Sequence, residues 1–297
     1  MRRVSLTIGI IFFSFCLSRQ VWAFGVAPAT IDTSGNRGEV VEQTFTLVND
    51  NNQETFFYFE TLKIEAKDES GSPKFIPYNT DHSELPDWIT LSTKKLVVPA
   101  RSFVEVPFSV NIPADVQSKS YSAAITVSDN APITETTIQT FQTKTAILVF
   151  LTVNGENNEQ AGLLDLKVSP KWGSQISGSV NFRIQNQGNV YIKPQGTITF
   201  KDILGRTLKT ISANPDESRV LPGTTRTIEI TFSKENFWKE LTVGPVTAEL
   251  SLVYGDSKKT LNKTTTIWII PWQIILVILG GISFLIGIKK LLKTKKK

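Results

Sequence analysis

The sequence predicts an all-β protein made of two tandem immunoglobulin-like β-sandwich domains and one C-terminal transmembrane helix. Apolar and polar residues alternate in many short segments, such as 104–112, and this period is typical of strands with one buried face. Turns rich in Asn, Gly and Pro separate these segments at roughly ten-residue intervals, which favours sandwiches over barrels or propellers. Residues 267–288 form an uncharged apolar run with the length of a bilayer-spanning helix.

Residues 1–23 have the features of a secretory signal peptide. A pair of arginines follows the initial methionine, residues 4–17 are apolar, and a small-residue cleavage pattern ends at Ala23. We therefore expect cleavage between Ala23 and Phe24, so that Phe24 begins the exported chain. An uncleaved signal anchor is the alternative that these residues leave open.

Charge and cysteine content exclude several functional classes. The formal net charge is +5, but the six lysines of residues 289–297 and the three arginines of residues 1–23 more than account for it. The part between them is mildly acidic, so nothing favours nucleic-acid binding, which needs a basic face on the folded domain. The single cysteine, Cys16, lies in the predicted signal peptide. The exported chain is thus expected to lack disulfides and to depend on its hydrophobic cores.

The predicted strands follow one another along both halves of the chain. Each has period-two alternation or is a short apolar run between turns. Pro107 stands on the outward side of its strand and predicts an edge or a bulge there, because proline cannot donate to a ladder. The predicted strands are 45–48, 56–66, 104–112, 121–127, 146–153, 180–184, 198–200, 228–232 and 246–254.

An internal repeat sets the expected number of domains. In the first half, the segment 45–49 (FTLVN) leads into an Asn-rich turn, and a proline turn at 98–100 precedes an alternating strand. The second half repeats this order with the segment 182–186 (FRIQN) and a proline turn at 221–223. We expect the first sandwich at residues 24–155, a polar linker at 156–161 and the second sandwich at 162–266.

The apolar run 267–288 predicts a membrane span, because a globular core rarely needs so long a segment without charge. Trp268 and Trp272 stand where amphipathic rings favour the membrane interface, and Lys289 and Lys290 begin a lysine-rich tail typical of the cytoplasmic side. With the signal peptide, these features predict a single-pass type I protein of the cell membrane. Its N-terminal domains would be extracytoplasmic and its tail cytoplasmic. A buried core helix is the alternative.

The search for catalytic or metal-binding residues finds little. His82 is the only histidine, so a metal site or a Ser-His-Asp triad could contain no other. It lies in the acidic loop 79–87, where a metal-binding loop is the alternative to a solvated polar loop. We expect no enzyme activity and no cofactor. Aromatic residues expected in packing, with a carbohydrate platform as the alternative, are Tyr58, Phe59, Trp88, Trp172 and Trp238.

Short motifs and the order of segments resemble one family, the WxL-interacting proteins of Gram-positive cell surfaces. The segments 24–28 (FGVAP), 98–101 (VPAR) and 121–125 (YSAAI) are similar to that family's peptidoglycan-binding domain. The segments 185–188 (QNQG) and 221–223 (LPG) are similar to its host-binding domain. The likeness covers nearly the whole chain and implies a bacterial protein that functions in binding and adhesion at the cell wall.

Two functions are compatible with these features. We favour a membrane-anchored cell-surface binding and assembly protein that holds peptidoglycan or a partner surface protein through its two sandwiches. Its partners would be cell-wall polymer or surface proteins, together with the membrane that its single span crosses. The alternative is an envelope chaperone-like assembly factor, or an envelope enzyme with an unrecognised site.

The predicted cleavage site can be tested directly. N-terminal sequencing or intact-mass measurement of the exported protein should find Phe24 as its first residue, because the small-residue pattern ends at Ala23. A retained Met1 would contradict cleavage and would leave the protein with two membrane segments.

Overall fold

The computed structural model describes residues 24–76, 84–131, 144–235 and 240–294, and most of them are in β-strands, as predicted. The predicted signal peptide lies outside the described residues, and Phe24 opens the first strand. Contacts divide the chain into two compact units. The first comprises residues 1–63, 77–116 and 121–151, and the second comprises residues 64–76, 117–120 and 152–297.

The first unit is built from two sheets. One has the order β1 (Phe24–Ala27), β3 (Val40–Asn49), β8 (Ser102–Asn111) and β6 (Ile89–Leu91). The other has the order β2 (Thr30–Gly35), β10 (Lys144–Val153), β9 (Ser120–Ser128), β4 (Thr55–Ala66) and β5 (Pro73–Ile76), and β7 (Lys95–Val98) also pairs with β4. A short helix, α2 (Leu85–Trp88), precedes β6. Residues 64–76, which include the end of β4 and the whole of β5, belong by their contacts to the second unit although their strands extend this sheet.

Period-two alternation builds the core of the first unit. Phe45 and Leu47 of β3 point inward from one sheet, Phe57 and Phe59 of β4 point inward from the other, and all four side chains are buried. The rings of Phe45 and Phe59 lie 5.9 Å apart in an edge-to-face contact between the sheets. The two sheets therefore pack face to face as a sandwich.

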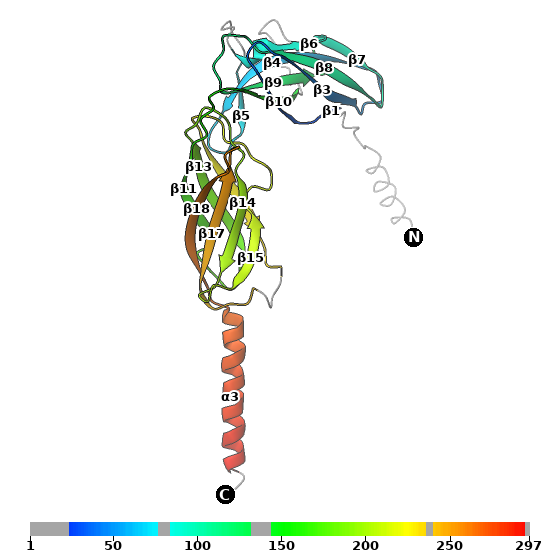
Figure 1. The fold of residues 1–297 in the computed structure, drawn as a ribbon. Coiled ribbons are helices and arrows are strands. Elements are labelled where there is room, and N and C mark those ends of the chain that lie inside the picture. The colour runs from blue at the N-terminus through cyan, green and yellow to red at the C-terminus, as the bar shows by residue number, and fades with distance from the viewer. Residues whose placement is uncertain (1–23, 77–83, 132–143, 236–239, 295–297) are drawn as a thin grey trace, which may run out of the picture. The chain divides into compact units, whose positions relative to one another are not determined.

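The second unit contains a second sandwich (Figure 1). Its core is continuous between the two sheets, and the rings of Phe200 and Phe232, one from each sheet, lie 4.9 Å apart. One sheet has the order β11 (Ala161–Ser169), β13 (Gly178–Asn186) and β16 (Thr225–Phe232). The other has the order β12 (Trp172–Gly173), β18 (Lys259–Ile269), β17 (Gly244–Tyr254), β14 (Gln195–Lys201) and β15 (Thr207–Ser212).

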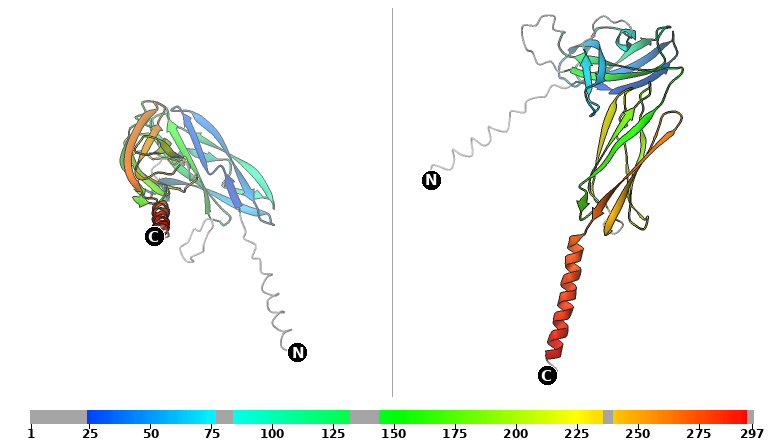
Figure 2. Two further views of the ribbon diagram at one scale, coloured as in Figure 1. Left: turned by 90° about the horizontal axis from the view of Figure 1, so that it is seen from below. Right: turned by 90° about the vertical axis from the view of Figure 1, so that its left-hand side faces the viewer.

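The C-terminal helix begins later than the sequence predicted. α3 spans Trp272–Thr294, whereas the prediction was 267–288. Ile267 and Ile269 are the last inward residues of β18, only 3% and 2% exposed, so the sandwich core takes the start of the apolar run. The right-hand view of Figure 2 shows α3 continuing from the end of this sandwich. α3 is long and apolar enough to cross a membrane.

The internal repeat corresponds to a repeated structural feature, a buried asparagine. Asn49 ends β3 and Asn186 ends β13, and both side chains are inaccessible to solvent. Nδ2 of Asn49 donates to both carbonyls of the segment 98–99, at 3.0 Å each. Nδ2 of Asn186 donates to the carbonyls of Val190 and Val220, at 2.7 and 2.9 Å. In each sandwich one carboxamide thus ties the end of a core strand to the proline turn predicted by the repeat.

Pro107 lies where one side of its strand becomes an edge, as predicted. The pairing of β8 with β3 runs through Pro107 without a shift of register. On the other side, the pairing of β8 with β6 stops at Leu91 and Phe108, immediately before Pro107. The missing N–H therefore costs the sheet no ladder hydrogen bond.

The buried carboxamide gives a prediction about stability. Asn186→Ala should lower the free energy of unfolding by about 2–5 kcal/mol, because two buried carbonyls lose their donor. Chemical denaturation followed by circular dichroism would measure the change. The matched control is Asn181→Ala on the same strand, where no side-chain bond is lost and a change within about 0.5 kcal/mol is expected. Equal effects of the two substitutions would contradict the role of Asn186.

Candidate functional site

Most of the residues considered for chemistry turn out to be structural or lie outside the described chain. Within the described ranges, no group of three or more His, Cys, Asp and Glu residues is placed to hold a metal ion. His82 lies outside those ranges, as does Trp238. Of the aromatic candidates, Phe59 and Trp88 are buried, whereas Trp172 is largely exposed. Packing in a core therefore accounts for Phe59 and Trp88.

The predicted membrane-anchor residues are divided between two elements. Trp268 belongs to β18 and stacks on Trp172, with ring centroids 5.5 Å apart. Trp272 is the first residue of α3. Lys289 and Lys290 both lie inside α3, which continues to Thr294 beyond the predicted end of the span at residue 288. The interfacial role of the tryptophans and the cytoplasmic position of the lysines stay predictions.

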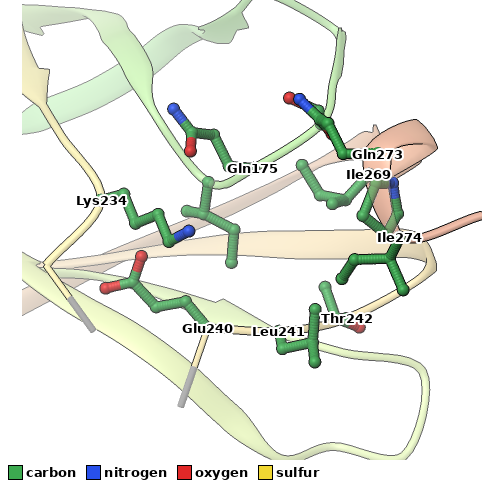
Figure 3. Close-up of a pocket in the computed structure, with 11 residues that line it drawn as sticks. Gln175, Lys234, Glu240, Leu241, Thr242, Ile269, Gln273 and Ile274 are labelled. Carbon is green, nitrogen blue, oxygen red and sulfur yellow. The ribbon is translucent and has the colours of Figure 1, made fainter. Parts of the chain in front are cut away.

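A small cavity of about 220 Å³ lies where the second sandwich meets α3. Its apolar side includes Ile269 of β18 and Ile274 of α3, and the polar side includes Lys234 and Glu240. Figure 3 shows the Lys234 ammonium and the Glu240 carboxylate pointing toward each other beside the cavity. Two facing groups of opposite charge favour a structural role for these residues over a reactive one.

Lys209 of β15 is a buried cation close to this cavity. Its Nζ atom lies 2.8 Å from Oε1 of Glu235 and 3.4 Å from Oε1 of Glu240. The Lys209 and Glu240 side chains are only 3% and 4% exposed. Removal of either charge would leave the other buried without a counter-ion, which is strongly destabilising. The same Glu240 oxygen accepts the backbone N–H of Glu235 at 3.2 Å. Lys209, Glu235 and Glu240 thus connect the β16–β17 segment to β15, and their role is structural.

A second hollow, of about 390 Å³, is lined by Arg226 and the nearby acidic residues Asp216 and Glu229. Burial and the charge of Arg219 lower the pKa of the Arg226 guanidinium, which Asp216 opposes. Nη1 of Arg226 donates to the backbone carbonyl of Arg219 at 2.8 Å. The guanidinium is thus held by the protein itself, as part of the wall of the hollow.

The arrangement best suited to recognition is the free side of β7 in the first unit. β7 pairs with β4 from Thr55 and Val98 to Tyr58 and Lys95, and it pairs with no other strand among the described residues. The N–H of Phe59 donates to the carbonyl of Lys94 at 3.1 Å. Since antiparallel pairs alternate, Lys95 and Val97 turn their backbone groups away from β4. β7 therefore presents backbone donors and acceptors along an open edge.

The two outward-facing residues of β7 differ in how their backbone groups are satisfied. The Thr93 hydroxyl accepts the N–H of Lys95 at 3.2 Å and donates to its carbonyl at 2.6 Å. For Val97, the described residues supply no equivalent partner on this side. The open edge of β7 is therefore centred on Val97. Lysines next to an edge are a common protection against unspecific pairing.

An apolar surface accompanies this edge. Val97 lies directly opposite Phe56 of β4, and these side chains are 37% and 46% exposed on the outer face. The Lys95 ammonium lies over the rings of Phe56 and Tyr58, at 4.0 and 5.4 Å from their centroids. These cation–π contacts hold the lysine over the aromatic rings. We call the surface formed by Phe56, Tyr58, Lys95 and Val97 the β7 edge site.

No motif in the sequence pointed directly to the β7 edge site. The prediction treated Tyr58 as a packing residue and did not include 95–98 among the strands. Pro107 of β8 was the only residue that predicted a sheet edge. On that side of β8 it has no N–H to donate to an added strand. The proline and the open β7 side thus distinguish an edge that resists strand addition from one that permits it.

No family model and no curated protein sequence matches this chain. The solved structures that it resembles include the class 5 fimbriae chaperone CfaA, with a TM-score of 0.43, 13% identity, and coverage of 82% of this chain and 99% of that chain. The Pseudomonas aeruginosa CupB2 chaperone has a TM-score of 0.38 and 9% identity over 82% of this chain and 100% of that chain. The CsuC–CsuE chaperone–tip adhesion subunit complex of Acinetobacter baumannii has a TM-score of 0.37 and 12% identity over 69% and 89%.

These comparisons correct the function favoured from sequence. The prediction that the sandwiches hold peptidoglycan was wrong, because the structures that the chain resembles are fimbrial chaperones rather than wall-binding modules. The resemblance to WxL-interacting proteins stays a prediction that none of these comparisons tests.

The buried ion pair predicts a strongly non-additive pair of substitutions. Lys209→Met should lower the free energy of unfolding by about 3–5 kcal/mol, because it leaves the Glu240 carboxylate buried without its cation. The double variant Lys209→Met/Glu240→Gln should recover most of that loss, as measured by denaturant unfolding of both single variants and the double variant.

The exposed pair of Lys201 and Glu249 offers a matched control for that cycle. Its side chains are 35% and 40% exposed, so Lys201→Met should cost no more than about 1 kcal/mol. If the effects of Lys209→Met and Glu240→Gln simply add, the two residues do not form the buried pair described.

Proposed function

We propose that the chain is a membrane-anchored, chaperone-like assembly factor that binds an extended segment of a bacterial surface protein at the β7 edge site. The observation that carries the proposal is the open side of β7, where the backbone groups of Val97 face away from β4. An extended segment added there would form main-chain hydrogen bonds with β7. Its alternate side chains would pack against Val97 and Phe56.

The size of the site supports transient rather than permanent binding. β7 has four residues, and only two of them turn their backbone groups outward. Each main-chain hydrogen bond contributes about 0.5–1.5 kcal/mol net, so a strand this short would hold a partner weakly. Weak binding suits a factor that must release its partner. Confinement of both proteins near one membrane would raise their effective concentration.

The proposed topology places the two immunoglobulin-like sandwiches outside the cytoplasmic membrane. Residues 1–23 would direct export and α3 would anchor the exported chain, with Lys289 and Lys290 on the cytoplasmic side. In the CsuC–CsuE complex a chaperone is bound to a tip adhesion subunit. By analogy, we propose a surface protein as the partner of this chain. No catalytic step is part of the proposal.

The experiment replaces Val97 by proline in the full-length protein and measures surface proteins in the source bacterium. Val97→Pro removes an N–H that points away from β4, so the β4–β7 ladder keeps its hydrogen bonds. Quantitative proteomics should show at least one surface protein that is depleted when the gene for this chain is deleted, compared with the parent strain. Val97→Pro should deplete the same protein at least about tenfold, whereas Val97→Thr, which keeps the N–H and a similar shape, should restore it.

A photo-cross-linking residue at position 97 identifies the contact itself. It should capture the depleted surface protein, and the cross-linked peptide should come from an extended segment. Thr44, exposed on the outer side of β3 in the other sheet, is the matched control position and should not capture it. Normal surface levels in a stable, normally expressed Val97→Pro strain would contradict the proposal.

A further inference from the structure

Exposed apolar side chains gather at the end of the second sandwich from which α3 leaves. We call these residues the apolar rim. Ile203 and Leu204 are the most exposed of them, at 75% and 89%. Apart from the six residues of the rim, the exposed large apolar side chains among the described residues of this sandwich are Leu164 and Val253. The apolar rim consists of Trp172, Ile203, Leu204, Val243, Trp268 and Ile270.

Strand pairing brings three parts of the rim together. Trp172 of β12 pairs in parallel with Trp268 of β18, and their rings stack at an interplanar angle of 15°. Gly244, the first residue of β17, pairs with Ile269 at the end of β18, so the preceding residue Val243 lies at the same end. Two of these side chains come from strands and the third from the residue that precedes β17, and all three share one end of the five-stranded sheet.

The turn between β14 and β15 adds the two most exposed residues. Lys201, the last residue of β14, pairs with Thr247 near the start of β17, which places the turn 202–206 at this end of the sheet (Figure 1). Oδ1 of Asp202 accepts the backbone N–H of Leu204 at 3.0 Å and that of Arg206 at 2.8 Å. The tip that carries Ile203 and Leu204 is therefore held in place.

Further bonds fix this turn to the residues beside α3. Nη2 of Arg206 donates to the carbonyl of Leu241 at 2.8 Å, and Leu241 lines the cavity that also contains Ile274 of α3. Burial opposes ionisation of Asp202, but hydrogen bonds from the backbone and side chain of Arg206 hold its pKa below the usual value. The turn thus has fixed, internally paired charges at its base and two apolar side chains at its tip.

The start of α3 is held close to the rim. Ile270 and Pro271 alone separate β18 from α3, a link that spans at most about 7 Å. The N–H of Ile270 donates to the carbonyl of Gly173 at 2.7 Å, and the N–H of Trp272 donates to the carbonyl of Ile270 at 2.8 Å. A bilayer entered by α3 at Trp272 would therefore begin beside the rim.

We propose that the apolar rim lies in the interfacial layer of the bilayer that α3 crosses, so that the second sandwich stands directly on the lipid surface. The inference rests on the proposed membrane anchoring by α3. Stacked tryptophans and aliphatic tips suit the region between headgroups and acyl chains. Arg206 pairs with Asp202 at 3.0 Å, and Lys209 pairs with Glu240 at 3.4 Å, so these nearby charges satisfy each other. The proposed ligand is the interfacial layer of a phospholipid bilayer, and phosphatidylcholine is the probe for it.

The test is lipid-specific quenching of a fluorophore in the full-length chain, reconstituted in phosphatidylcholine vesicles. Cys16 is the only native cysteine, so a Cys16→Ser background permits single labelling with an environment-sensitive dye. Labels are placed through Leu204→Cys or Val243→Cys in the rim. Val253→Cys is the matched control, because it is an exposed valine of the same strand that follows Val243. Val277→Cys, exposed on α3, reports insertion of the helix.

Nitroxide on the acyl chain near the headgroup should quench the labels at 204 and 243 at least threefold more than the label at 253. The label at 277 should also be quenched. Quenching at 277 with none at 204 and 243 would overturn the rim proposal while leaving the membrane anchor intact. Absence of quenching at 277 as well would overturn both, since α3 would then not lie in the bilayer.

Discussion

Each sandwich depends on one buried carboxamide at the end of a core strand. Asn49 and Asn186 have no access to water, yet each satisfies carbonyl groups that the surrounding apolar residues cannot. A buried carbonyl without a donor costs more than an ordinary hydrogen bond contributes, so the turn must stay where the carboxamide reaches it. In the first unit one of these carbonyls belongs to Val98, the last residue of β7. The same bond that closes the sandwich therefore positions the β7 edge site.

The first sandwich protects some positions along the edges of its two sheets and leaves one position of β7 open. Thr93 satisfies the backbone of Lys95, and Pro107 removes a donor from the free side of β8. What remains is a short opening at Val97, beside the apolar surface of Phe56. Edges of this kind bind extended chains, and their short length limits unspecific pairing. Recognition without a catalytic group is consistent with a protein that binds and releases a partner.

Where the second sandwich meets α3, one apolar run is divided between a buried strand and an exposed helix. Ile267 and Ile269 enter the core, whereas the side chains of residues 272–289 are mostly exposed along α3. The change falls at Ile270 and Pro271, which follow the last residue of β18, and proline is tolerated at the start of a helix. The junction is short, so the base of the sandwich and the first turn of α3 form one surface.

The sequence by itself determined the strands with clear alternation or apolar runs, a C-terminal helix long and apolar enough to cross a membrane, and the paired Asn and Pro motifs, because periodicity, length and turn chemistry are local properties. The helix was predicted to start at residue 267 because, in an unbroken apolar run, periodicity does not distinguish a buried strand from a helix. Only the tertiary structure decided that Val97 lies opposite Phe56, that β7 has a free side, and that Leu204 and Trp268 share one end of the sheet. These features depend on pairings between residues far apart in the chain, and no local pattern specifies which strand a given edge will meet.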